Sequence, residues 1–233
     1  MTSPMEDIFI TDVVTRDIRF HTSKGKHGSD AMSPDPEYSC VYMVLVTSER
    51  NLEGHGFTFS IGRGNEIMQL AAETLKHKII GRSLGEITNW DTGADGSKYG
   101  FATLWRDLCY GSQMKWCGPE KGPVHQAAAG IVNAVWDLWA KFEGKPVWKL
   151  VADMPNEQLV GCLDFRYVSD MITPEEAIKI LDREAEGLQS RIEEMQSVGY
   201  PVSSHNALMN EYASALPRLR YVIWCPCISC ASC

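Results

Sequence analysis

The chain has 233 residues, of which 44% are hydrophobic and 22% are charged. This composition is ordinary for a globular protein, and the length fits one domain or two small ones. The formal net charge of -8, with no Lys/Arg-rich run, argues against binding to nucleic acid or to an anionic membrane surface. No apolar run approaches the roughly 18 to 20 residues that span a bilayer. The N-terminal stretch has the character of neither a signal peptide nor a transit peptide, so we expect a cytosolic location.

Three segments near the N-terminus carry the pattern of β-strands. They cover residues 8 to 20, 38 to 49 and 54 to 62, and they are rich in β-branched and aromatic residues. We expect a three-stranded antiparallel meander. The connection between the first two strands is much longer than the usual hairpin loop of about two to five residues. Long loops inside compact domains tend to be functional, which draws attention to the stretch GKHGSDAM at residues 25 to 32.

The hydrophobic period changes from strand to helix at Asn65. The helix predicted there would end near Gly81, and its apolar face would consist of Ile67, Leu70, Ala71, Thr74, Leu75 and Ile79. Residues 90 to 100 are rich in turn-forming residues and indicate a surface loop. A short helix is expected over residues 101 to 110.

A long helix follows, with Pro119 at a natural first position and Glu143-Gly144 at its end. Its wide apolar face would be formed by Val124, Ala128, Ile131, Val132, Val135, Leu138 and Trp139. A short helix is expected over residues 146 to 154.

The segment from 159 to 167, LVGCLDFRY, is mostly apolar and predicts a strand buried on both faces of a parallel sheet. Thr173-Pro174-Glu175-Glu176 has the features of a helix start, and the helix would run to about Ser197. A strand followed by a long helix is the first step of an α/β repeat. Without partner strands the apolar run would need a substitute, either residues 221 to 224 or another chain, or it would aggregate.

The eight cysteines fall into two groups. One group is scattered among apolar neighbours and indicates reduced thiols in the core, namely Cys40, Cys109, Cys117 and Cys162. The other is crowded into the C-terminal tail, at Cys225, Cys227, Cys230 and Cys233. Four thiols suffice for a zinc or Fe-S site, although their spacing is compressed. A tail unrelated to the fold is the favoured interpretation.

Three further patterns have an ordinary explanation that we favour over a functional one. Lys24-Gly25-Lys26 and Lys76-His77-Lys78 could supply a lysine base, but solvated charges explain them better. Gly62-Arg63-Gly64 could hold an anion before a helix, but it lacks the third glycine of a dinucleotide motif and is typical of helix capping. His125, on the apolar helix, is interpreted as a core histidine.

The stretch AAGIVNAVWDLWAK at residues 128 to 141, with the following GKPVWKLV, resembles the N-terminal domain of the mandelate racemase/muconate-lactonizing branch of the enolase superfamily. Within that branch the segments DIRFHTSKGKHGSDAMSPDPEYS, GFTFSIGRGNE, KWCGPEKGPVH and CLDFRYVSD are similar to the L-fuconate dehydratase group. These segments are long and collinear. The resemblance covers about residues 7 to 201.

The resemblance implies an α+β fold, in which an enolase-like N-terminal capping domain covers residues 1 to 157. In the family this domain, a three-stranded meander followed by a helical bundle, packs on a (β/α) barrel and lends loops to its mouth. The loop after the first strand closes over the sugar acid, so Gly28, Ser29, Asp30 and Tyr38 are the expected substrate-binding residues. A glycine lets backbone N-H groups approach a ligand, while Asp and Tyr supply hydrogen-bonding oxygens. A disordered loop is the alternative.

The resemblance also implies what this sequence lacks. The family's chemistry removes the proton α to a carboxylate and stabilises the enediolate on Mg²⁺. It uses a Lys-x-Lys pair, three carboxylate ligands and a His-Asp dyad on barrel strands, and none of these positions occurs here. A barrel takes about 250 residues. We therefore expect residues 158 to 201 to hold only the first strand and helix of an incomplete barrel, followed by a divergent Cys-rich tail at 202 to 233.

The function expected from these arguments is that of a truncated Mg²⁺-dependent sugar-acid dehydratase, inactive alone, with neither catalytic residues nor a bound metal in this chain. A sugar acid such as L-fuconate would bind only if a barrel were supplied. The alternative is a non-catalytic module that binds a full-length relative, or that associates with another chain through the incomplete barrel. The family also leaves a mitochondrial location open.

Overall fold

The fold is seen in a computed structural model that describes residues 4–91, 98–111, 113–117 and 122–197. The predicted helix start at Pro119, the substitute strand at 221–224 and the cysteine tail lie outside the described residues.

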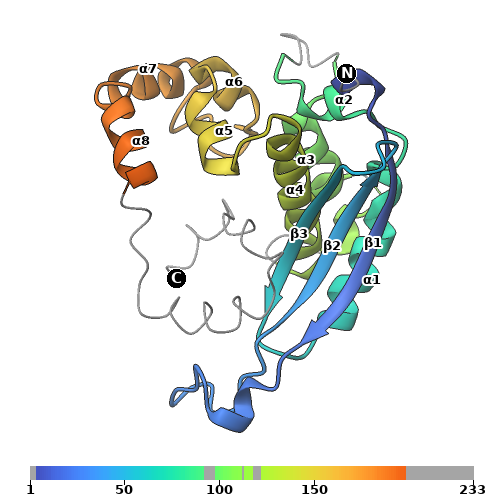
Figure 1. The fold of residues 1–233 in the computed structure, drawn as a ribbon. Helices are drawn as coiled ribbons and strands as arrows, with labels where there is room; N and C mark the ends of the chain where they lie inside the picture. The colour runs from blue at the N-terminus through green and yellow to red at the C-terminus, as the bar shows by residue number, and fades with distance from the viewer. Residues whose placement is uncertain (1–3, 92–97, 112, 118–121, 198–233) are drawn as a thin grey trace.

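A three-stranded antiparallel sheet is the centre of the fold (Figure 1). It consists of β1 (Ile10–Arg19), β2 (Ser39–Thr47) and β3 (Glu53–Ser60), in the order β1-β2-β3. Val41, Met43 and Leu45 of β2 are fully buried, while the residues between them are partly exposed. This alternation arises because successive side chains of a strand point to opposite faces. The predicted meander is confirmed.

Helices α1 (Asn65–Leu75) and α4 (Pro123–Phe142) cover one face of the sheet (Figure 1). They bury the apolar core together with the strands. Its fully or almost fully buried members include Ile10, Val13, Met43, Leu45, Leu75, Ile131, Val135 and Leu138. Burial of each large apolar side chain stabilises the fold by about 1.5 to 3 kcal/mol. The core therefore fixes the sheet as a rigid base for the loops at its ends.

The apolar face of α1 differs from the prediction. Ile67 and Leu70 are exposed, at 57% and 65%, whereas Met68 and Ala72 are buried. The buried apolar face therefore consists of Met68, Ala71, Ala72 and Leu75, and the small side chains of the two alanines let the helix lie close to the sheet. The α-helix ends at Leu75, earlier than predicted, and a short 3-10 turn, η3 (Lys76–Lys78), leads into Gly81, where φ is 86°.

The other predicted helices of this region are confirmed, with small differences at their ends. Residues 101 to 110 form α3 (Phe101–Tyr110), and a short α2 (Leu84–Thr88) precedes it. The long helix α4 has Pro123 in its first turn and Gly122 as its N-cap, and most of its predicted apolar face is buried. Three further 3-10 turns are η1 (Met5–Asp7), η2 (Thr22–Gly25) and η4 (Lys115–Cys117).

The predicted barrel strand at 159 to 167 is wrong. Residues 147 to 161 form α5 (Val147–Asp153) and α6 (Asn156–Gly161), and turns follow. A short apolar run fits a buried helix as well as a strand. Here Val160 and Cys162 reach the core, and a helix pairs its backbone groups without the neighbouring strands that a parallel strand requires. Helix α6 runs across residue 157, where the domain boundary was expected; the boundary itself stays a prediction.

The predicted helix after Thr173 is present but divided. Thr173 and Glu176 form a reciprocal capping box at the start of α7 (Pro174–Glu184), as the sequence predicts. Gly187 adopts φ 75° and separates α7 from α8 (Leu188–Ser197). None of the helices in the described ranges has the length and apolarity needed to cross a membrane.

Candidate functional site

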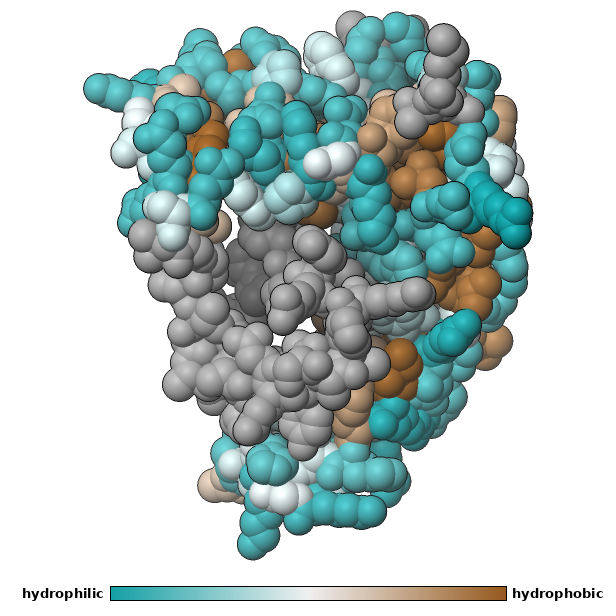
Figure 2. Space-filling model, in the orientation of Figure 1, coloured by the Kyte–Doolittle hydropathy of each residue, from teal (hydrophilic) through white to brown (hydrophobic). Residues whose placement is uncertain are grey.

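The loop between β1 and β2, residues 20–38, holds all the predicted substrate-binding residues and is called the β1–β2 loop. It extends past one end of the sheet, at the bottom of Figure 1, whereas α5 to α8 lie at the upper left of the view, away from this loop. Its surface in Figure 2 is mainly hydrophilic. The structure gives this loop a defined path with many internal hydrogen bonds, and its role as a lid stays a prediction.

Thr22 closes the neck of the loop, where its two limbs meet. The side chain is buried, and its Oγ1 donates a 2.8 Å hydrogen bond to the carbonyl oxygen of Pro36. The same oxygen accepts a 3.0 Å hydrogen bond from the backbone N-H of Tyr38. One hydroxyl thus joins both limbs, and the loop folds on itself as a compact Ω-loop does.

Glu37 forms a second connection across the neck. Its carboxylate accepts a hydrogen bond from the hydroxyl of Ser23, and its Oε2 lies 2.8 Å from Nδ1 of His21. The hydrogen bond from Ser23, followed by that from His21, holds the pKa of Glu37 below its usual range. The backbone N-H of Glu37 also donates a 3.0 Å hydrogen bond to the carbonyl oxygen of Ile61, which follows β3.

The tip of the loop brings the predicted residues together. Gly28 has φ 69°, and its carbonyl oxygen accepts a 3.0 Å hydrogen bond from the hydroxyl of Tyr38. The hydroxyl of Ser29 donates to the carbonyl oxygen of Lys26 at 2.8 Å. Oδ1 of Asp30 accepts hydrogen bonds from the backbone N-H groups of residues 32 and 33 at 2.8 and 2.7 Å. Since both bonds use Oδ1, Oδ2 of this exposed carboxylate can accept a hydrogen bond from a ligand hydroxyl group.

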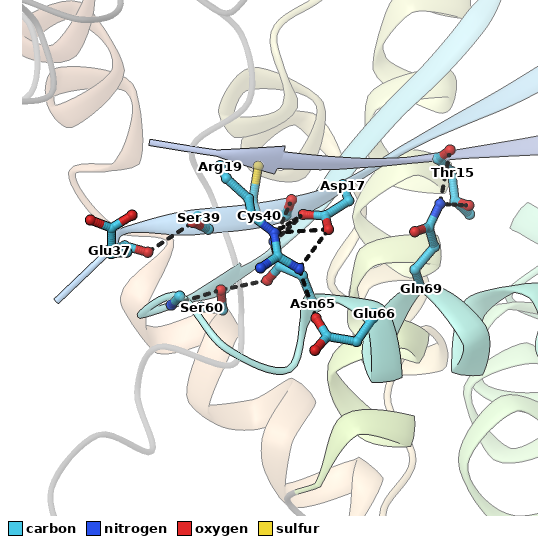
Figure 3. Close-up of polar contacts among 11 residues, drawn as sticks. Thr15, Asp17, Arg19, Glu37, Ser39, Cys40, Ser60, Asn65, Glu66 and Gln69 are labelled. Atoms are coloured by element: carbon cyan, nitrogen blue, oxygen red, sulfur yellow. Dashed lines mark hydrogen bonds and ion pairs between the residues drawn. The ribbon is translucent and has the colours of Figure 1, made fainter. Parts of the chain in front are cut away.

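A buried asparagine that the sequence analysis missed lies at the base of the loop (Figure 3). Asn65, which is 0% exposed, donates through Nδ2 to Oδ1 of Asp17 at 2.7 Å and to the carbonyl oxygen of Cys40 at 3.2 Å. Its Oδ1 accepts a 2.5 Å hydrogen bond from the hydroxyl of Ser60. This one side chain therefore links all three strands to the start of α1. Its position directly after the Gly62-Arg63-Gly64 turn was the available signal.

Arg19, the last residue of β1, extends this network to the surface (Figure 3). Its guanidinium pairs with Asp17 at 2.8 Å and with Glu66 of α1 at 2.7 Å. The hydrogen bond from Arg19 is the main reason why the pKa of Asp17 is lowered. The β1–β2 loop begins at the next residue, so its first limb leaves from a fixed point.

The other sequence candidates have structural explanations. Lys76 pairs with Glu73 at 2.6 Å, and Lys24 and Lys26 are exposed, which fits the reading of these lysines as surface charges. His125 is only partly buried and packs between Trp105 and Tyr110, at ring-centroid distances of 5.5 and 5.7 Å.

The scattered cysteines differ in their exposure. Cys109 and Cys162 are buried as predicted, Cys40 is half-buried and Cys117 is exposed. Burial, followed by the nearby charge of Asp17, raises the pKa of the Cys40 thiol to about 11, which disfavours its thiolate.

Comparison with known proteins identifies the fold. No protein-family model matches the chain. The chain is 45% identical over 207 residues to bovine (Bos taurus) mitochondrial enolase superfamily member 1, covering 88% of this chain and 44% of the relative. The structure superposes on the crystal structure of the human mitochondrial enolase superfamily member 1 with a TM-score of 0.76 and 38% identity, over 91% of this chain. The chain belongs to the enolase superfamily.

It corresponds to the N-terminal portion of these enolase superfamily proteins and spans less than half of their length, 44% of the bovine protein and 48% of the human one. It is also 45% identical over 204 residues to L-galactonate dehydratase from the fungus Hypocrea jecorina, covering 87% of this chain and 43% of that enzyme. The predicted family and the capping-domain fold are therefore confirmed.

The described part of this enolase superfamily chain contains no set of side chains that could bind the superfamily's Mg²⁺. No three His, Cys, Asp or Glu side chains of the described residues lie together in a way that could hold a metal ion. The described residues therefore do not fit a magnesium centre. What they offer a ligand is hydrogen-bonding oxygens and backbone groups at the tip of the β1–β2 loop.

Proposed function

We propose that this chain provides the substrate-covering cap of a sugar-acid dehydratase, with the β1–β2 loop as its lid. The observation that carries the proposal is the 45% identity over 204 residues to a protein named L-galactonate dehydratase, which includes the cap portion of that enzyme. The substrate class is accordingly an aldonic acid such as L-galactonate or L-fuconate. These two acids differ by one hydroxyl group, at C6.

The geometry of the β1–β2 loop supports this role. A lid must hold its polar groups in a fixed position above a polyol. Here the hydrogen bonds from Thr22 to Pro36 and from Ser23 to Glu37 hold the two limbs of the loop together at its neck. Gly28 leaves room for the Tyr38 hydroxyl that supports the tip, and Asp30 and Ser29 offer oxygens to ligand hydroxyl groups. In this proposal Gly28, Ser29, Asp30 and Tyr38 form the ligand-facing tip, with Tyr38 also supporting Gly28.

The chemical step itself needs groups that the described residues do not contain together. Removal of a proton α to a carboxylate requires a base and stabilisation of the enediolate, which the superfamily obtains from Mg²⁺ when it is bound. The described residues can bind, orient and shield a sugar acid. We therefore expect no dehydration of L-galactonate or L-fuconate by the 233-residue chain alone with Mg²⁺. Turnover by this chain would contradict the proposed division of labour.

A loop exchange tests the lid role in an intact enzyme. Residues 20–38 of this chain would replace the aligned segment of the Hypocrea jecorina L-galactonate dehydratase. Retention of most of the turnover of L-galactonate is the expected result, because the loop carries its own neck connections. Loss of turnover in a correctly folded exchange enzyme would reject the assignment of this loop as a sugar-acid lid.

Compartment and partners belong to the same proposal. The animal relatives are named mitochondrial, which favours a mitochondrial location over the cytosolic one expected from the N-terminal stretch; fractionation of cells expressing the tagged chain tests it. Association with another chain would use Leu163, Tyr167 and Met171, which are exposed in the turns after α6. Gel filtration at increasing concentration would detect such association.

A further inference from the structure

The first limb of the β1–β2 loop leaves the sheet at Arg19. The guanidinium of Arg19 is held by Asp17 on its own strand and by Glu66 in the first turn of α1. Asp17 is in turn held by Nδ2 of Asn65 at 2.7 Å. The departure point of this limb is therefore connected to α1 through two routes, one at the surface and one buried.

The second limb returns to the sheet through Glu37. Its backbone N-H bonds to Ile61, and the next residue, Gly62, lies close to it. A Cβ atom on Gly62 would come within 3.0 Å of Cβ of Glu37, so the limb rests on this turn. The hydroxyl of Ser60 accepts a 3.3 Å hydrogen bond from the N-H of Gly62 and donates to Oδ1 of Asn65. The return point is thus also connected to Asn65.

Asn65 is where the two connections meet. Its amide nitrogen donates to Asp17 of β1, which holds Arg19 at the start of the first limb. Its amide oxygen accepts from Ser60 of β3, next to the turn on which the second limb rests, as Figure 3 shows. We propose that Asn65 is a positioning residue that sets the spacing and angle of the two limbs, and thereby the placement of the loop tip. The proposal rests on the proposed role of the β1–β2 loop as a lid.

The chemistry of the site explains why an asparagine is needed. An amide both donates and accepts, whereas a carboxylate at this position could only accept and would place a second negative charge beside Asp17. An apolar side chain would fill the space but leave Asp17, Ser60 and the Cys40 carbonyl without this partner. A buried polar group that loses its hydrogen-bond partner destabilises the fold, so both the nitrogen and the oxygen of the amide are required here.

Hydrogen exchange on the full 233-residue chain, without any sugar acid, tests the proposal. Asn65→Asp keeps the shape and removes the donor. Ser60→Ala removes only the connection to the second limb. Gln69→Glu is the matched control, because Gln69 is also an amide of α1 that donates to β1, to Thr15 Oγ1 at 3.1 Å, but lies further from the loop.

The expected result is local. Asn65→Asp should raise exchange in residues 22–33 about tenfold and Ser60→Ala about fivefold, as the loss of buried hydrogen bonds predicts. Gln69→Glu should leave the loop unchanged. Exchange in β2 should stay within about twofold of the wild type in all variants.

Two results would overturn the proposal. One is an unchanged loop in Asn65→Asp and Ser60→Ala, and the other is an equal rise in the loop and in β2, which would make Asn65 a residue of general stability. If Asn65→Asp does not fold, Ser60→Ala decides alone. The hydrogen-exchange measurement needs no ligand, so its outcome is independent of the loop exchange in the dehydratase. Either the role of Asn65 or the lid role can therefore be rejected while the other is retained.

Discussion

The hydroxyl of Tyr38 donates a 3.0 Å hydrogen bond to the carbonyl oxygen of Gly28, across ten positions of the sequence. Tyr38 lies at the end of the β1–β2 loop, next to β2, while Gly28 lies at its tip. The ring of Tyr38 also packs on Phe59 of β3, at a centroid distance of 5.6 Å. The tip is therefore supported from the sheet itself.

Removing this hydroxyl should loosen the tip without unfolding the protein. Tyr38→Phe keeps the ring contact and loses one hydrogen bond, with an expected cost of about 0.5 to 1.5 kcal/mol. Hydrogen exchange of residues 27–31 should rise, while chemical denaturation changes little. Tyr42→Phe is the control, because its hydroxyl contacts His55 on the sheet at 2.9 Å. An equal effect of both variants on the loop would contradict this account.

Gly28 should resist substitution more than another glycine with a similar backbone. Gly28→Ala would place a Cβ atom 2.1 Å from the Tyr38 hydroxyl oxygen at φ 69°, whereas Gly81→Ala at φ 86° meets nothing within 4 Å. Both substitutions carry the left-handed penalty of about 1 to 2 kcal/mol. Urea unfolding should show a loss near that penalty for Gly81→Ala and a larger one for Gly28→Ala. Equal losses would show that the predicted clash is relieved at no cost.

The sheet could be predicted from the sequence because its signal is local. Alternating β-branched and aromatic residues mark β2, and the residues predicted to lie between strands do form turns and loops. The run at 159 to 167 was misread because an apolar segment of that length fits a helix as well as a strand. Its helical state is decided by contacts of Val160 and Cys162 with a core built from distant segments, which periodicity does not show.

The site was predictable only in part, and for a similar reason. The family resemblance is what nominates Gly28, Ser29, Asp30 and Tyr38, whose binding role stays a proposal, and the loop's length gives independent support. The role of Asn65 was invisible because it depends on Asp17 and Ser60 being brought together by the sheet. A polar residue at the start of a helix normally indicates a cap, yet here it is buried and bonds to the strands.

Acid should weaken the neck of the loop through Glu37. Because the folded-state pKa of Glu37 is lowered, mainly by Ser23 and then by His21, its stabilising contribution is present above the unfolded pKa of about 4.3 and is lost as pH falls through the folded value. Thermal unfolding of the wild type and of Glu37→Gln should therefore differ at pH 6 and converge as pH drops below about 4. A difference that persists or grows in acid would contradict this assignment of the carboxylate.

Steady-state kinetics of the loop-exchanged dehydratase decide whether the tip touches the sugar acid. Asp30→Asn keeps Oδ1 for its two backbone hydrogen bonds but turns the ligand-facing oxygen into a donor. It should raise the KM for L-galactonate about tenfold or more, as loss of a charged acceptor predicts. The control Asp35→Asn, in the same exposed loop, should leave KM unchanged. An unaltered KM in Asp30→Asn, or an equal rise in both variants, would contradict the assignment of the β1–β2 loop as a substrate-covering lid.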